Sequence, residues 1–380
     1  MKQCIKLNTM TDQKTADATD DPLSHGALSG GPLTGVRILD LSSVVSGPMA
    51  AVILADQGAD VIKVEPPGWG DGIRGLGASR NGLSAIFSLI NRNKRSVGIN
   101  LKHPEGQRLV KLLAGTADVV LQNYRPGKMA RLGLGFEDLA ACNSDLIYAS
   151  ISGMGEVGPY AEQKVYDYVI QGMSGALDAQ AENGEPKMMR TIVYDKVTAL
   201  TTAQAITAAL YAREKGAGGQ HLKIAMLHAG IYFNWPDLMW NYSFKGDDVQ
   251  MAGDLADMYE ISHAKDGAIV SHHLGADTSE YSTADLLAIL AENDIPVSRV
   301  NSRHEVPDDP QVKALGLLEE LDHPRGGRMQ LPKAPVTFSK TPAQHRYHSP
   351  EVGQHTVEVL TELGLEMDDM RALAQEGAIG

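Results

Sequence analysis

Apolar runs and helical periodicities alternate through the first 230 residues of this chain. Strands are predicted over 36–41, 60–65, 97–101, 117–121, 146–151 and 221–226, where short runs of aliphatic residues stand between turn residues. Helices are predicted over 49–57, 103–114, 166–174 and 197–212. Because a strand, a helix and a strand follow one another within about 30 residues, the strands are expected to be parallel with right-handed crossovers. The pattern predicts an α/β fold with a doubly wound parallel sheet.

The pattern changes after about residue 230. A helix over 283–292 and a strand over 297–300 predict a smaller second domain, and two helices over 350–363 and 367–375 are expected to pack back on the first domain. Several aromatic residues precede the second domain: Trp235, Trp240, Tyr242 and Phe244. The predicted domain boundaries are a tail (1–30), a large domain (31–228), a linker with the small domain (229–318) and a returning C-terminal segment (319–380).

Composition and charge narrow the class of protein. A chain of 380 residues with 43% hydrophobic content can bury a large core and form two domains. A net charge of -13 argues against nucleic-acid binding, because no general basic field would attract phosphates. The two cysteines, Cys4 and Cys142, are too few for a disulfide framework. No apolar run reaches the roughly 20 residues of a membrane span, and residues 1–30 contain no signal core. We expect a cytoplasmic protein with a mobile N-terminal tail and no membrane partner.

Several motifs suggest a chemistry that their context does not support. Glu65 and the run Gly70–Gly75 resemble a dinucleotide fingerprint, but that fingerprint belongs at the turn after the first strand, which here is Ser42–Pro48. His263, His272 and His273 lack the spacing of known metal sites and are interpreted as surface or loop residues. Nucleophile-elbow and P-loop motifs do not occur in the sequence. We expect no metal and no nicotinamide or flavin cofactor.

Basic residues lie beside two of the predicted strands. Lys94, Arg95 and Lys102 flank the strand over 97–101, and Arg125 and Arg131, with Lys128 between them, follow the strand over 117–121. Such residues can form solvated turns. They can also bind phosphate, because ligands of open α/β sheets bind at the carboxyl ends of the strands.

Asp195 follows a short β-type run, 191–194, and precedes the helix predicted over 197–212. The simplest interpretation is an ordinary N-cap. The alternative is a reactive carboxylate, whose charged form a helix N-terminus would favour. The N–H groups of 196–198 would then face negative charge that develops during a reaction.

Taken together, the motifs of this chain resemble those of the family III CoA-transferases, which include formyl-CoA transferase and α-methylacyl-CoA racemase. The matching stretches occur in the same order as in the family: GVRILDLSSVVSGPMAAVILADQGADVIKVEPP (35–67), NRNKRSVGINLK (91–102), DVVLQNYRPG (118–127), GLGFEDL (133–139), IYASISGMGEVGPYA (147–161), YDYVIQGMSG (166–175), the Asp195 segment, AREKGAGGQHLKIAM (212–226) and DIPVSRVNSRHEVPDDPQVKALGLL (294–318). As a set they are highly specific.

The resemblance implies a fold, a nucleophile and a ligand. The subunit would be ring-shaped, with a Rossmann-like large domain and a small domain, and two subunits would interlock as a homodimer. Asp195 would be the nucleophile, acyl-CoA and a small carboxylic acid would be the substrates, and no cofactor would be bound permanently. The resemblance places the following residues at the CoA site: Val44, Ile99, Lys102, Asn123, Tyr124, Arg131 and Lys164. We add Lys94, Arg95 and Arg125 for their charge, and Val45, Tyr166 and Asp167 for their position.

Three departures from the family affect the expected activity. Val45 stands where the formyl-CoA transferase branch has a glutamine, which counts against formyl or oxalyl specificity. Tyr166-Asp167 stands where the racemase branch has a His–Asp pair, so a two-base proton exchange loses its imidazole. Residues 271–293 are shorter than is usual in the family and no glycine-rich active-site loop is found, so the small domain is expected to be reduced. We predict a CoA-transferase. The alternatives are a 2-methylacyl-CoA racemase or acyl-CoA isomerase, and a CoA-binding protein that has lost catalysis.

Overall fold

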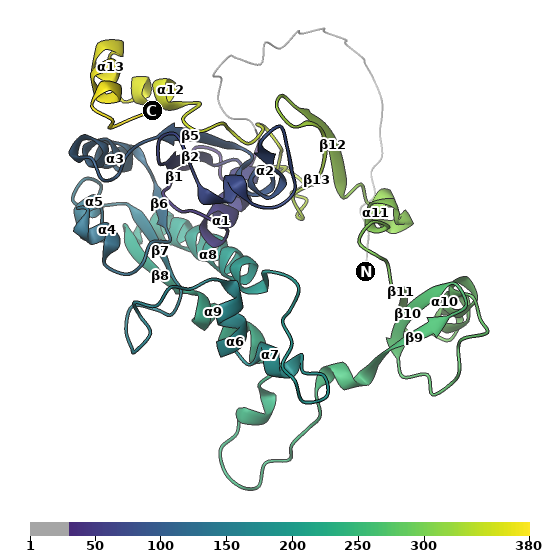
Figure 1. Ribbon diagram of the computed structural model, residues 1–380. Coiled ribbons are helices and arrows are strands. Elements are labelled where there is room, and N and C mark those ends of the chain that lie inside the picture. Colours follow the sequence, from purple (N-terminus) through teal and green to yellow (C-terminus); the bar gives the residue numbers. More distant parts are fainter. Residues whose placement is uncertain (1–29) are drawn as a thin grey trace, which may run out of the picture.

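A six-stranded parallel sheet forms the centre of the large domain in the computed structural model, which describes residues 30–380 (Figure 1). Its strands are β1 (Arg37–Asp40), β2 (Asp60–Glu65), β5 (Lys94–Gly98), β6 (Val119–Gln122), β7 (Ile147–Ser152) and β8 (Gln220–Ala225). The order is β5-β2-β1-β6-β7-β8 and every neighbouring pair is parallel. The chain therefore starts in the middle, runs outward to β5, and crosses back to continue from β6. The predicted doubly wound α/β sheet is confirmed, and its strand order reverses between β1 and β6.

Helices cover both faces of the sheet because successive strand residues point to opposite sides. Ile38 of β1 packs in one core with α1 (Ser46–Asp56), α8 (Val193–Ala212) and α9 (Met226–Asn234). Leu39 packs in the other core with α3 (Pro104–Thr116) and with the C-terminal helices α12 (Thr356–Glu362) and α13 (Met367–Gln375). The end of the chain thus completes the core that its beginning starts.

Shorter elements connect these layers. The helices are α2 (Ala85–Asn91), α4 (Lys128–Arg131), α5 (Phe136–Ala140), α6 (Asp167–Met173) and α7 (Ala176–Ala179). A single-turn helix, η1 (Gly72–Gly75), and a small hairpin, β3 (Ser79–Arg80) with β4 (Leu83–Ser84), follow β2.

A smaller unit stands apart from the sheet in Figure 1. It contains the antiparallel strands β9 (Tyr259–Ala264), β10 (Gly267–His272) and β11 (Val297–Arg299) and the helix α10 (Thr283–Glu292). Ile269, Leu286 and Leu290 form its own small core. The chain returns through α11 (Pro310–Ala314) and the hairpin β12 (Leu318–His323) with β13 (Gly327–Pro332). The amide of Asn81 donates a 2.9 Å hydrogen bond to the carbonyl of Arg325 at the hairpin tip, so this hairpin contacts the large domain.

Two local predictions are wrong. The strand expected at 97–101 runs from Lys94 to Gly98, so Lys94 and Arg95 are strand residues and do not lie in a basic loop. No strand forms over 191–194, because α8 begins at Val193. Asp195 therefore lies in the first turn of the helix. In both places, contacts between segments distant in the sequence outweigh the local pattern.

The remaining predictions concern the N-terminal tail, the two cysteines and membrane-spanning segments. The tail 1–29 and Cys4 lie outside the described residues, and Cys142 is an exposed free thiol. Between residues 30 and 380, none of the helices is both long and apolar enough to cross a bilayer.

Candidate active site

A cleft of about 610 Å³ opens at the carboxyl edge of the sheet, where the strand order reverses. The segment 43–46 after β1 forms one wall, and the segment 123–131 after β6 forms another. Residues 151–153 at the end of β7 and the loop 161–166 complete the lining together with Asp195 and Met226. Parallel strands direct their connecting loops to this edge, which is where α/β folds bind ligands.

Most of the predicted site residues line this cleft. They are Val44, Val45, Asn123, Tyr124, Arg125, Arg131, Lys164, Tyr166 and Asp195. Lys128, which lies between Arg125 and Arg131 in the sequence, also lines it, and its ammonium lies 4.3 Å from the ring centroid of Tyr124. Burial and the neighbouring charges of Lys102, Arg125 and Arg131 lower the pKa of Lys128. This part of the cleft therefore concentrates positive charge, which suits a phosphate-bearing ligand.

Lys94, which was also expected to bind phosphate, is instead bound inside the fold. Lys94 is buried, and its ammonium donates to Asp40 Oδ2, to the Pro48 carbonyl and to Asn91 Oδ1, each at 2.9 Å. Burial lowers the pKa of Lys94 to about 8, although Asp40 acts in the opposite direction. Because this ammonium already has three acceptors around it, Lys94 is not available to a ligand in the cleft.

Arg95, Ile99, Lys102 and Asp167 also lie outside the lining of the cleft. The guanidinium of Arg95 joins Asp60 to Glu358 and Glu362 and so fastens α12 to the sheet. Ile99 is fully buried in the core. Lys102 is exposed, and only its charge reaches Lys128. The structure therefore separates these residues from the wall formed by Arg125 and Arg131.

Asp167 lies directly behind Asp195 and caps the start of α8. Its Oδ1 accepts hydrogen bonds from the backbone N–H groups of Tyr194 at 2.6 Å and Asp195 at 3.0 Å. Its Oδ2 accepts a 2.6 Å hydrogen bond from Gln171 Nε2. These contacts correct two expectations. Asp195 is not the N-cap of α8, and the N–H groups of 196–198 lie inside the helix, so they do not face the cleft.

Asp195 is a buried carboxyl group that retains access to the cleft, with 9% of its surface exposed. Burial and the negative charge of Asp167 raise the pKa of Asp195 to about 7. The backbone N–H of Ser46, in the first turn of α1, acts in the opposite direction. A carboxyl group in such surroundings is readily desolvated and interconverts between its two protonation states near neutral pH. This suits covalent or acid–base catalysis.

Sequence reasoning missed two charged residues under the cleft, Lys63 and Asp71. Both are buried, and their side chains form a 3.0 Å ion pair. Lys63 interrupts an otherwise apolar strand, DVIKVE, and such a lysine requires a buried partner. That signal was present in the sequence, but it does not identify which of the 47 acidic residues is the partner. Glu65, which resembled a ribose-binding acid, is bound instead by Arg74 at 2.5 Å.

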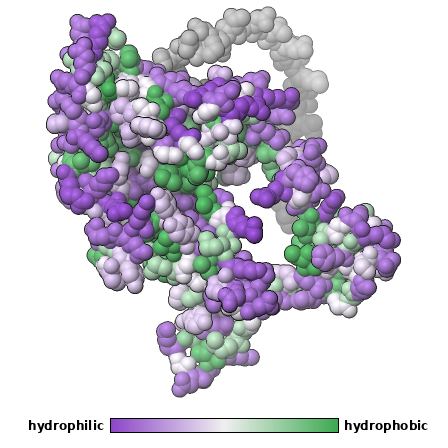
Figure 2. All heavy atoms as spheres, viewed as in Figure 1, coloured by the Kyte–Doolittle hydropathy of each residue, from purple (hydrophilic) through white to green (hydrophobic). Residues whose placement is uncertain are grey.

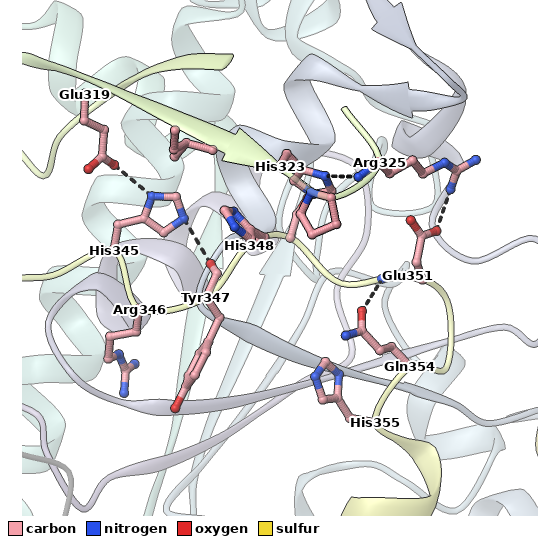
Figure 3. A pocket seen from close by; sticks show the side chains of 13 residues that line it. Glu319, His323, Arg325, His345, Arg346, Tyr347, His348, Glu351, Gln354 and His355 are labelled. Carbon is pink, nitrogen blue, oxygen red and sulfur yellow. Dashed lines mark hydrogen bonds and ion pairs between the residues drawn. The ribbon is translucent and has the colours of Figure 1, made fainter. Parts of the chain in front are cut away.

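A second cavity, of about 690 Å³, lies between the β12–β13 hairpin and the segment 345–355 (Figure 3). Histidine and charged side chains line it, but they largely bind one another. His345 contacts Glu319 at 2.8 Å and the carbonyl of Tyr347 at 3.1 Å, while Arg325 pairs with Glu351 at 2.5 Å. None of the predicted site residues lies there. Within the described part of the chain, no group of three or more His, Cys, Asp or Glu residues is placed to bind a metal ion.

Comparisons with known proteins show the family to which this chain is similar. A family model described as CoA-transferase family III matches residues 33–278 and 260–356. The succinate–glutarate CoA-transferase of Agrobacterium fabrum is 34% identical over 87% of this chain and 96% of its own length. The succinyl-CoA:glutarate CoA-transferase of Homo sapiens is 32% identical over 90% of this chain and 88% of its own. The crystal structure of a CAIB/BAIF family protein from Brucella suis superposes with a TM-score of 0.77 at 30% identity, covering 88% of this chain and all of that one.

Proposed function

The chain belongs to CoA-transferase family III, and from this premise we propose that it moves CoA from an acyl-CoA to a free carboxylic acid through covalent intermediates on Asp195. The observation that carries the proposal is the position of Asp195. It is a buried carboxyl group with a pKa of about 7, and it opens into a cleft that also contains four basic residues, Arg125, Lys128, Arg131 and Lys164. A phosphate-bearing thioester held by these cations would extend toward the carboxylate.

The proposed chemistry conserves the energy of the thioester. The ionised Asp195 attacks the thioester carbonyl, CoA thiolate leaves, and an acyl-aspartyl anhydride forms. The thiolate then attacks the aspartyl carbonyl, releasing the first acid and leaving an aspartyl-CoA thioester. The carboxylate of the second acid attacks this thioester and expels the thiolate, which attacks the new acyl group and restores the Asp195 carboxylate. Dividing the exchange into covalent steps lowers each barrier.

We propose that both acids are short dicarboxylic acids. Support comes from the relatives named for succinate and glutarate, which this chain matches over most of its length. Val45 at the cleft adds an aliphatic side chain and no hydrogen-bonding group, which is consistent with an acyl group longer than formyl.

We propose that the CoA phosphates bind to Arg125, Lys128 and Arg131, with Lys164 on the opposite loop. All four line the cleft. Lys94 and Arg95 are omitted from this set because both are bound by acidic residues within the fold.

We propose an interlocked homodimer of ring-shaped subunits. Large apolar side chains are exposed along α9, the linker that follows it and β9 of the small domain, including Tyr232 at 80%, Phe244 at 73% and Ile261 at 62%. Figure 2 shows apolar residues on the side of the small domain that faces the large domain. A soluble monomer rarely exposes so many apolar side chains in one region, so a partner surface is the simplest cover for them.

Mass spectrometry of the protein incubated with succinyl-CoA and quenched with hydroxylamine tests the nucleophile. A hydroxamate on the peptide that contains Asp195, absent in Asp195→Ala, is the expected result. CoA binding without any adduct would contradict a covalent mechanism. Exchange of the α-proton of a 2-methylacyl-CoA for deuterium in the absence of a free acid would then indicate a racemase, whose acid–base chemistry a carboxyl pKa of about 7 also suits. Binding without either reaction would indicate a protein that only binds CoA.

A further inference from the structure

The turn between β1 and α1 holds a residue in an unfavourable backbone conformation at the wall of the cleft. Val44 has a φ of +70°, in the left-handed region that β-branched residues rarely adopt. It lines the cleft, and two residues later Ser46 begins α1, lines the same cleft as Asp195 and lowers the pKa of Asp195 through its backbone N–H. Such a conformation persists only where the surrounding structure holds it, and it tends to occur at functional sites.

Asp71 holds this conformation. Its two carboxylate oxygens accept hydrogen bonds from the backbone N–H of Val44 at 3.0 and 3.2 Å. Lys63 Nζ donates to Asp71 Oδ2 and to the carbonyl of Ser42, both at 3.0 Å. Asp71 and Lys63 are 3% and 0% exposed, so water does not compete for these contacts. The Asp71 carboxylate therefore binds the N–H of Val44, and the Lys63 ammonium binds the carbonyl of Ser42 in the same turn.

A second buried ion pair, between Asp40 and Lys94, binds the other side of the same turn. Asp40 Oδ1 accepts a 3.0 Å hydrogen bond from the N–H of Ser42, and Lys94 bridges Asp40 Oδ2 and the carbonyl of Pro48. Buried ion pairs are seldom a source of net stability, because desolvation offsets their attraction. Two of them around one turn of seven residues at the ligand edge indicate a role in geometry.

We infer that Asp71 is a positioning residue of the transfer reaction, which holds Val44 in its left-handed conformation and thereby keeps the Ser46 N–H at the Asp195 carboxyl. This inference rests on the proposed function of Asp195. It adds a residue that does not touch substrate but determines where the first N–H group of α1 lies. That N–H favours the ionised form of Asp195 and orients its attacking oxygen.

The test compares Asp71→Asn with Asp71→Asn/Val44→Gly in the full-length protein. Glycine adopts a positive φ without strain, so with glycine at position 44 the turn no longer needs the hydrogen bonds to the Asp71 carboxylate. We expect Asp71→Asn to slow acylation of Asp195 by succinyl-CoA by about 10- to 100-fold, because displacing a reacting group by about 1 Å can cost about 100-fold. The Val44→Gly substitution in that background should recover about tenfold. In Asp71→Asn, CoA affinity should change by less than about threefold, because Asp71 does not line the cleft and the phosphate-binding cations are untouched.

Titration of the Asp195 carboxyl by ¹³C NMR, read by difference from Asp195→Asn, gives a second readout that does not require catalysis. Asp71→Asn should raise the Asp195 pKa, because the Ser46 N–H that lowers it moves away. If Asp71→Asn does not fold, the double variant Lys63→Gln/Asp71→Asn takes its place in every comparison, because it leaves no unpaired buried charge.

The outcomes separate this inference from the proposed function. No hydroxamate on Asp195 in the wild type overturns the proposed nucleophile, whatever Asp71 does, and the NMR titration then decides the role of Asp71. Normal acylation and an unchanged Asp195 pKa in folded Asp71→Asn overturn the positioning role. Slow acylation that Val44→Gly does not recover also overturns it, because the defect would then not arise from the conformation of Val44.

Discussion

Replacing Asp167 by asparagine should move the ionisation of Asp195 to lower pH. The wild-type carboxyl has its pKa raised from 3.8 to about 7, which corresponds to about 4 kcal/mol in favour of the neutral form. Burial is the larger cause and the charge of Asp167 the second. Asparagine keeps an oxygen that can accept the N–H groups of Tyr194 and Asp195 and removes the charge, together with the hydrogen bond that Oδ2 accepts from Gln171 Nε2.

The size of the shift follows from the geometry. Asp167 Oδ1 is 3.0 Å from the backbone nitrogen of Asp195, and neighbouring charges shift the pKa of a carboxyl group across separations of up to about 6 Å. With an effective dielectric constant of about 20, Coulomb's law gives about 3 kcal/mol for that separation, or about 2 pKa units. Solvent in the cleft screens part of this, so we expect the Asp195 pKa to fall by about 1–2 units in Asp167→Asn.

The assay is the pH dependence of kcat/KM with succinyl-CoA. The attacking carboxylate must be ionised, so the wild-type rate should fall below a pH of about 7. The Asp167→Asn rate should fall only below a pH of about 5–6. Asp368→Asn, at a surface carboxyl that is 92% exposed, is the matched control and should keep the wild-type profile. Ionisation of the CoA phosphates affects all three proteins equally and cancels in the comparison. A wild-type acid limb below about pH 5.5, or identical limbs in wild type and Asp167→Asn, would refute the reasoning.

Three further predictions concern stability and binding. In chemical denaturation, Asp195→Asn should stabilise the protein by about 1–3 kcal/mol at pH 8 and by nothing at pH 4. The reason is that the wild-type carboxyl, with its pKa raised in the folded state, contributes stability that is present below pH 3.8 and lost as the pH rises through about 7. Equal effects at both pH values would contradict the assigned pKa. Arg131→Ala should weaken CoA binding about tenfold and reduce its dependence on salt, whereas Arg95→Ala should lower the melting temperature and leave CoA affinity unchanged, as calorimetry can show. If Arg95→Ala weakens binding as much as Arg131→Ala, the separation of the two residues is wrong. Gly230→Ala should destabilise by about 1–3 kcal/mol in thermal unfolding, because the added Cβ would lie 2.9 Å from the ring of Tyr194; an unchanged melting temperature would show that α8 and α9 adjust freely.

The large-domain topology could be predicted from the sequence because its signal is local. Ile38 and Leu39 are both apolar, as a strand covered on two faces requires, and the strands and helices alternate at the spacing of βαβ units. The cleft could be predicted for the same reason, since loops after parallel strands meet at one edge. Asn123, Arg125 and Arg131 lie where that rule places them.

The errors arose where a charged residue is paired over a long sequence distance. Lys94 and Arg95 look like a basic loop in the sequence, but Lys94 binds Asp40, 54 residues earlier, and Arg95 binds Glu362, 267 residues later. Hydrophobic periodicity cannot detect such strands, because a fully paired lysine is buried as an apolar residue would be.

The sequence by itself determined the sheet, the edge at which the cleft opens and, through the family resemblance, the candidate nucleophile, because these depend on local periodicity and on motifs. Only the tertiary structure decided the chemical state of that nucleophile. Asp167 from α6 and Ser46 from α1 lie next to Asp195, and together with burial they set its pKa near 7. Electrostatic energy depends on distances between charges and on the exclusion of water, and neither exists until distant segments of the chain have packed together.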